Sequence, residues 1–97
     1  MLSNTASELL IDERHVLDAR SFVELVVWRL PGPVRGSRHS LKYRLALVVD
    51  EVCVLRYDNE TGKGDHRHLR RSEVPYRFVD LDTLMTDFWR DVGRWRR

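Results

Sequence analysis

Hydrophobic and polar residues alternate along much of the chain, which is the pattern of β-strands that bury one face. Residues 41–49 and 52–57 show the alternation most clearly, and together they are predicted to form a hairpin. Its turn falls at Asp50 and Glu51, which are not a preferred turn pair, so we expect a slightly irregular turn. Residues 22–30 carry apolar side chains on both faces, which indicates a strand in the interior of the sheet.

Shorter segments complete the predicted sheet. Residues 9–11 are apolar enough for a short strand, and residues 65–70 can extend as a further strand. Turns, loops and breaks are expected where proline, glycine and charged residues gather, at residues 18–21, 31–40, 58–64 and 72–75.

The C-terminal part of the chain changes to helical spacing. Apolar residues recur every three or four positions on one predicted helix face: Leu81, Leu84, Met85, Phe88, Val92 and Trp95. Asp80 is placed to cap the start of this helix, and the arginines after Gly93 suit its negative end. The whole pattern predicts an α+β fold in a single two-layer domain, with an antiparallel sheet of four to five strands and one C-terminal helix packed on it.

The size of the chain sets further limits. Its 97 residues suffice for one domain with a modest core, spanning residues 1–97, with residues 1–7 expected to be a loose terminus. No apolar run approaches the ~20 residues that a membrane-spanning helix needs, and the N-terminal residues lack the signal-peptide pattern. Cys53 is the only cysteine, so no internal disulfide can form. These features favour a cytoplasmic protein with no membrane partner.

Arginine supplies most of the positive charge. Fifteen of the 17 basic residues are arginines, and the 15 acidic residues leave a net charge of +2. Guanidinium groups bind phosphate bidentately and stack on bases, so the bias suits nucleic-acid contact, although a GC-rich genome explains it at least as well. The stretch 63–71 offers four candidate nucleic-acid contacts: Lys63, Arg67, Arg70 and Arg71. The alternative is a charged edge strand that resists pairing with other chains.

The segment 56–68 carries the most distinctive chemistry. If residues 65–70 form an extended strand, His66 and His68 project from the same face of that strand, about 7 Å apart. One imidazole could accept a proton and the other donate one during phosphodiester cleavage, because histidine titrates near neutrality. Lys63 would neutralise the charge on the phosphate, and the glycines beside it would let main-chain N–H groups approach.

Two other interpretations of the histidine pair stay open. His-x-His on a strand is also a metal-ligand spacing, for which Asp58 or Asp65 would supply the third ligand. The pair could equally be part of a polar strand surface beside a loop. Of the two chemical interpretations we prefer acid–base catalysis, so we predict a site without a metal or another cofactor.

Two tryptophans of the predicted helix are candidate partner contacts. Trp89 and Trp95 are less easily assigned to the core than the other apolar residues, and Trp95 lies between arginines. Aromatic and arginine side chains often anchor protein interfaces. The alternative is that these side chains fold back onto the sheet.

Several blocks of the sequence follow one another in a characteristic order, at residues 41–45, 54–59, 63–68, 75–78 and 87–89. With these blocks the chain resembles the TumE-like family, small proteins regarded as the toxin half of bacterial toxin–antitoxin pairs. The resemblance covers residues 8–95, and its most specific parts are Tyr-Asp-Asn and Gly-Asp-His-Arg-His. It implies a cytoplasmic toxin with a small DNA-binding antitoxin as partner, and it carries over a set of catalytic-site residues: Tyr57, Asp58, Asn59, Lys63, Asp65, His66 and His68.

The resemblance also favours an action on RNA, because toxins of this size commonly act on RNA. The leading hypothesis is therefore an RNA-binding endoribonuclease that cleaves without metal, and a homo-oligomer is compatible with it. The alternative is a non-catalytic interaction protein that binds the antitoxin or a cellular target. An enzyme should bring His66, His68 and Lys63 together in one open cleft. A binding protein should disperse them and expose apolar surface near Trp89 and Trp95.

Overall fold

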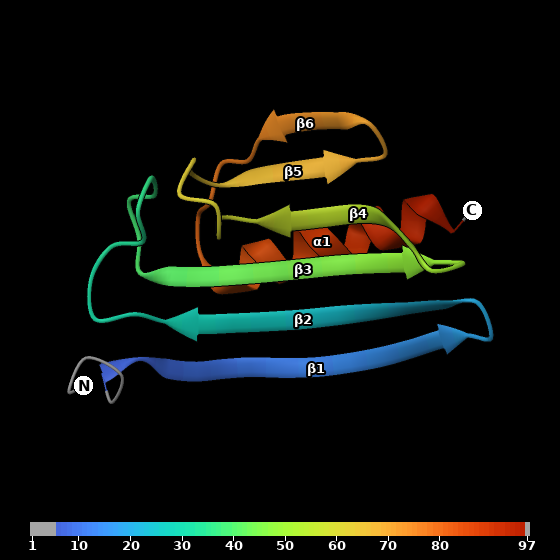
Figure 1. Cartoon of the computed structure of the whole chain (residues 1–97), viewed down its shortest axis with the longest axis horizontal. Helices are drawn as coiled ribbons and strands as arrows, with labels where there is room; N and C mark the ends of the chain where they lie inside the picture. The colour runs from blue at the N-terminus through green and yellow to red at the C-terminus, as the bar shows by residue number, and fades with distance from the viewer. Residues whose placement is uncertain (1–5, 97) are drawn as a thin grey trace.

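The computed structural model describes residues 6–96, which form one six-stranded sheet and one helix (Figure 1). The strands are β1 (Glu8–Asp18), β2 (Ser21–Arg29), β3 (Leu41–Val49), β4 (Val52–Asp58), β5 (His66–Leu69) and β6 (Ser72–Pro75). Every strand pairs antiparallel with the next one along the chain, so the order in the sheet follows the sequence. The expectation for residues 1–7 falls mostly on residues 1–5, which lie outside the described residues.

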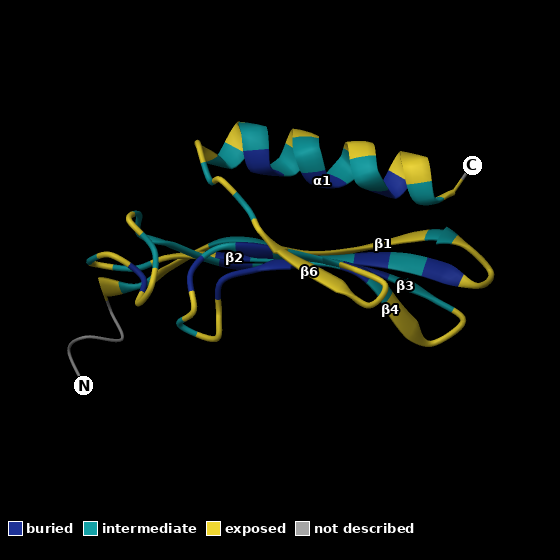
Figure 2. Cartoon of the chain, turned by 90° about the horizontal axis from the view of Figure 1, so that it is seen from above, coloured by how far each residue is buried: buried dark blue, intermediate teal, exposed yellow. Residues whose placement is uncertain are grey.

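Helix α1 (Leu81–Trp95) lies across one face of the sheet, and no other helix of residues 6–96 covers the opposite face (Figure 2). Its buried residues Leu84, Phe88 and Val92 join a core to which the inner strands contribute Val23, Leu25, Val27, Tyr43, Leu45, Leu47, Leu55 and Tyr57. The Asp80 carboxylate accepts the Thr83 N–H at 2.7 Å, as expected of a helix cap. The α+β class, the helix and its cap are thus confirmed, and no described helix is long and apolar enough to cross a membrane.

The sheet has six strands, so the prediction of four to five is wrong by at least one. The extra strand is β6, where the sequence predicts a break. Arg70 adopts a φ of 57° and turns the chain tightly, so Ser72 pairs with Leu69 and β5 and β6 form a hairpin. Pro75 is tolerated because it ends a strand at the edge of the sheet, where a missing N–H costs little.

The β3–β4 hairpin closes through a two-residue turn with positive φ at both residues, which is the geometry of a type I′ hairpin turn, so the expected irregularity of the turn is not found. Asp50 and Glu51 adopt φ values of 51° and 67°, a region that non-glycine residues seldom occupy. The register between the strands shifts between Leu47 and Val48. Arg20, in the neighbouring turn, steadies the hairpin because its Nε donates to Asp50 Oδ1 at 2.7 Å.

Candidate functional site

Strand alternation places both histidines on the face of the sheet that α1 does not cover. Tyr57 on β4 is buried in the core on the helix side, so its neighbours point to the opposite face. In the strand registers, Asp58 pairs with His66, Arg56 with His68, and His68 with Glu73. Five polar side chains from three strands therefore gather in what we call the histidine cluster: Arg56, Asp58, His66, His68 and Glu73.

The imidazoles and carboxylates of the histidine cluster are in contact. His66 Nε2 lies 2.9 Å from Asp58 Oδ1 and 3.2 Å from Glu73 Oε2. His68 Nε2 lies 3.2 Å from the same Glu73 oxygen, and Arg56 Nε lies 2.6 Å from Asp58 Oδ2. The Asp58 and His66 side chains are buried, whereas those of His68 and Glu73 are 29% and 42% exposed. The cluster therefore has a buried half and a half open to solvent.

The main chain fixes the proton on one nitrogen of His66. Its Nδ1 lies 3.1 Å from the Gly64 carbonyl oxygen, which can only accept a hydrogen bond, so Nδ1 carries a proton. In a neutral ring, Nε2 would then direct a lone pair toward the carboxylates of Asp58 and Glu73. This arrangement is electrostatically unfavourable, and a cation at Nε2, either a second proton or a metal ion, removes the conflict.

The structure brings together only part of the predicted cleft. Lys63 and His66 line a hollow of about 310 Å³, which Glu73 also borders. His68 lines another hollow, of about 140 Å³, with Arg56 and Arg70. The two histidines therefore meet, and Lys63 lies on the His66 side of the cluster.

Three donor atoms of the histidine cluster are arranged as metal ligands could be. His66, His68 and Glu73 each offer one, and these atoms all lie within 4.8 Å of one another. Of the two third ligands that the sequence suggests, Asp58 contacts His66. Asp65 does not join the cluster, because its carboxylate is engaged elsewhere.

Asp65 lies at the centre of a second polar network. Its carboxylate accepts hydrogen bonds from the Tyr43 hydroxyl at 2.8 Å and the Ser37 hydroxyl at 2.5 Å, and it contacts His39 Nε2 at 2.7 Å. Burial, together with the nearby Asp65 carboxylate, raises the pKa of Tyr43 far above its usual value. The network ties the loop before β3 to the loop before β5, and Asp65 also lines the hollow of Lys63 and His66.

Asn59 is part of the scaffold of the site. It is fully buried, and its Oδ1 accepts the Tyr43 main-chain N–H at 3.0 Å. Its Nδ2 donates to the Leu41 carbonyl at 2.8 Å and to the Ser37 hydroxyl at 3.3 Å. The side-chain amide therefore continues the pairing of β3 and β4 beyond the last residue of β4.

Tyr57 and Arg67 lie on the helix side of the sheet. The Tyr57 hydroxyl donates to Asp91 Oδ2 at 2.5 Å, and Arg67 Nη1 donates to the same oxygen at 3.1 Å. Burial, reinforced by Asp91, raises the pKa of Tyr57 to about 12. The structure thus separates both residues from the histidine cluster by the thickness of the sheet.

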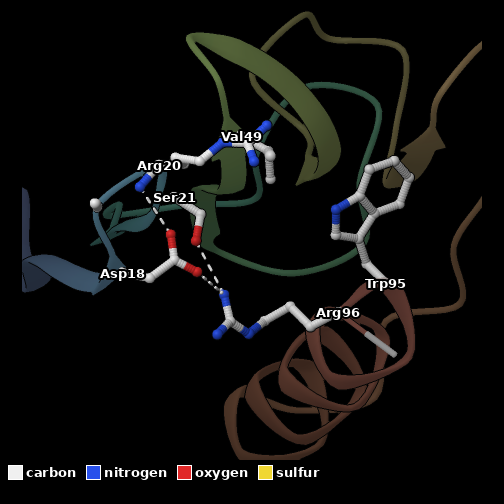
Figure 3. Close-up of a pocket in the computed structure, with 7 residues that line it drawn as sticks. Asp18, Arg20, Ser21, Val49, Trp95 and Arg96 are labelled. Atoms are coloured by element: carbon white, nitrogen blue, oxygen red, sulfur yellow. Dashed lines mark hydrogen bonds and ion pairs between the residues drawn. The ribbon is translucent and has the colours of Figure 1, made fainter.

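Trp95 and Arg96 lie where the end of α1 meets the β1–β2 turn. Arg96 Nη1 donates to Asp18 Oδ2 and to the Ser21 hydroxyl, each at 2.9 Å (Figure 3). Trp95 and Arg96 line a hollow of about 400 Å³ with that turn. The Arg70 guanidinium lies over the Trp95 ring, 4.6 Å from its centre. Trp95 is therefore half-buried and reachable from solvent.

The remaining predicted contacts lie on the periphery. Trp89 is half-buried and meets the His15 ring edge to face, with centroids 5.7 Å apart. Lys63 and Arg71 are exposed on loops at opposite ends of β5. Of the four basic residues predicted to contact nucleic acid, two contact side chains of α1. Arg67 contacts Asp91, and Arg70 lies over the Trp95 ring.

Sequence reasoning missed Arg56 and Glu73, which complete the histidine cluster. A strand at residues 72–75 with a two-residue turn before it would have placed Glu73 opposite His68. Arg56 could have been found by its parity, because it alternates with Tyr57 on β4. His39 gave no signal, since its loop position reveals nothing of its contact with Asp65.

Comparison with known proteins identifies a family. The sequence model of a family described as Toxin TumE matches residues 6–96. No curated protein and no solved structure matches the chain.

Proposed function

Because the chain belongs to the Toxin TumE family, we propose that it is the toxin of a bacterial toxin–antitoxin pair and that it cleaves RNA. Its partners would be RNA and a small DNA-binding antitoxin, and it would act in the cytoplasm. The cleavage would be metal-independent and would use histidines as acid and base.

The observation that carries this proposal is the meeting of two imidazoles on the helix-free face of the sheet, with Nε2 atoms that share Glu73 as a neighbour. With protons on both nitrogens, His66 satisfies the Gly64 carbonyl and the facing carboxylates, and in that form it is the general acid. His68 is the more exposed of the two rings and serves as the general base that takes a proton from a ribose hydroxyl.

Basic side chains beside the histidine cluster support binding of a polyanion. Lys63 is exposed and borders the same hollow as His66, where an ammonium group stabilises charge that develops on a phosphate. Arg56 borders the hollow of His68. Tyr57 and Asn59, which the family blocks carry over, hold the scaffold in this proposal and do not touch RNA. Asp65 also comes from these blocks, and it borders the hollow of Lys63 and His66.

A second candidate function is a non-catalytic interaction protein, and the surface of Trp95 favours it. The indole borders a hollow of about 400 Å³ that a side chain of a partner could fill. In this case the chain would inhibit its target by binding, and the histidine cluster would have no reaction to perform.

Induced expression and assays of purified protein test the enzyme. The wild-type chain should arrest growth and cleave RNA in the presence of EDTA, with a bell-shaped pH profile, because one ring must be neutral and the other protonated. His68→Ala and His66→Ala should each lower the cleavage rate by roughly 10²–10⁴-fold, the usual effect of a positioned proton-transfer group. Both variants should still bind RNA, and added salt should weaken that binding.

His15→Ala is the matched control, because His15 is exposed and contacts Glu13 at 2.7 Å outside the histidine cluster. It should leave cleavage unchanged. Since His66 is buried, circular dichroism must first establish that its variant folds, and His68 provides the independent test. A purified chain that binds no RNA, and whose toxicity survives both substitutions, would overturn the enzyme and leave the interaction protein.

A further inference from the structure

We infer that the histidine cluster binds one divalent transition-metal ion of the zinc class, with His66, His68 and Glu73 as ligands. The inference concerns the same site as the proposed function, and only its consequence for RNA cleavage rests on that function. Three features of the cluster support it: the spacing of the donor atoms, their orientation, and their chemical type.

The spacing fits a tetrahedral ion. Ligand bonds of about 2.1 Å in a tetrahedral zinc site place the ligand atoms roughly 3.4 Å from one another. Glu73 Oε2 lies 3.2 Å from His66 Nε2 and 3.2 Å from His68 Nε2, and all three donors lie within 4.8 Å of one another. A small inward shift of the partly exposed His68 and Glu73 side chains would complete the triangle.

The orientation of His66 fits a metal ligand. The Gly64 carbonyl holds His66 through Nδ1, which is the second hydrogen bond that metal-binding histidines usually make. This leaves the Nε2 lone pair for the ion. Asp58 Oδ1 is buried and forms no hydrogen bond with the described part of the chain, although His66 Nε2 is only 2.9 Å away.

The donor set selects the type of ion. Two imidazole nitrogens and a carboxylate suit zinc and cobalt, whereas magnesium and calcium prefer oxygen ligands. Asp58 lies outside this set of three donors and contacts only the His66 ring among them, at 2.9 Å. The 29% and 42% exposure of the His68 and Glu73 side chains gives the ion a route from solvent.

Metal binding has a consequence for the proposed reaction. A bound ion occupies the Nε2 lone pairs of both histidines, so neither ring can accept or deliver a proton there. Zinc should therefore inhibit RNA cleavage, and EDTA should restore it.

Titration calorimetry with Zn²⁺ and the visible absorption of added Co²⁺ test the site, on the full chain without a polyhistidine tag. We expect one ion per chain and the intense absorption of tetrahedral cobalt. His68→Gln and Glu73→Gln should each weaken Zn²⁺ binding at least tenfold, and Zn²⁺ should raise the melting temperature of the wild type more than that of either variant. Both residues are partly exposed, so these variants should fold.

His15→Gln is the matched control, because it removes an exposed histidine that has a single carboxylate neighbour. Wild-type affinity in His68→Gln and Glu73→Gln, or loss of binding in His15→Gln, would overturn the metal site. If the chain binds no zinc but cleaves RNA, the metal site fails and the proposed function stands. If zinc binds at these residues and cleavage requires it, the metal site stands and the metal-independent mechanism fails.

Discussion

Asn59 illustrates, at the scale of one residue, how a side chain in a distinctive sequence block can support the fold. Its amide makes three hydrogen bonds to groups around the start of β3, and it is fully buried. Its role therefore follows from hydrogen bonds that the buried main chain would otherwise lack.

Replacing Asn59 by Ala should lower the free energy of unfolding by about 2–3 kcal/mol, because buried main-chain groups of Tyr43 and Leu41 lose their partner. Urea denaturation measures the change. Glu60→Ala, at the exposed neighbouring position, should have almost no effect. If Asn59→Ala instead abolished RNA cleavage while keeping full stability, Asn59 would act in the reaction.

At the scale of elements, two loops position the reactive strands by direct contact of their main chains. A methyl group at Gly36 would overlap the Gly62 carbonyl and lie 2.6 Å from the Gly64 nitrogen, and Gly36 has a φ of 83°. The Gly64 carbonyl in turn faces His66 Nδ1. The loop before β3 thus fixes the loop that holds one ring of the histidine cluster.

Gly36→Ala should destabilise the fold by about 2 kcal/mol or more, because it combines a strained backbone with a main-chain clash. Gly32→Ala is the control, since a methyl group there would meet no atom within 4 Å beyond the adjacent residues, and the φ of Gly32 is not positive. Thermal unfolding of both variants measures the change. Equal melting temperatures would show that the close main-chain contact between the two loops does not stabilise the fold.

The contact between α1 and the β1–β2 turn makes stability depend on pH. The Arg20 main-chain N–H, followed by the Arg96 side chain, lowers the pKa of Asp18 from 3.8 to about 2. As the pH falls, Asp18 is protonated in the unfolded chain before it is protonated in the folded chain, because its pKa is higher in the unfolded chain. The stabilisation is therefore complete above about pH 4 and is lost as the pH falls to about 2.

Asp18→Asn should flatten the decline in the free energy of unfolding between about pH 4 and pH 2, measured by urea denaturation at a series of pH values. Arg96→Gln should flatten it less, because the Arg20 N–H still holds the carboxylate. If the free energy of unfolding of Asp18→Asn declined with pH as steeply as that of the wild type, Asp18 would have the same pKa in the folded and unfolded chain.

At the scale of the whole molecule, the helix end and the histidine cluster lie on different faces of the sheet, so partner binding and RNA cleavage should be separable. Trp95→Ala should weaken co-purification with the proposed antitoxin, because it removes an aromatic side chain from a solvent-accessible hollow. Trp28→Ala is the control, since Trp28 is 37% exposed and lies outside that hollow. Equal capture of the antitoxin by both variants would place the interface elsewhere.

Most elements, and the shared face of the two histidines, follow from local patterns in the sequence. Periodicity is a local property, so the alternation in residues 41–49 and the helical spacing after Asp80 were sufficient to predict β3 and α1. The same period of two places His66 and His68 on one face of β5.

The residues that surround that pair depend on contacts between distant parts of the chain. The neighbours of a strand residue depend on register, and the register of β6 depends on the left-handed turn at Arg70, which brings Glu73 opposite His68. The side of the sheet that α1 covers then separates Tyr57 from the cluster, although only eight positions in the sequence lie between Tyr57 and His66. Register and layer packing are set by contacts between distant segments, so periodicity alone could not supply them.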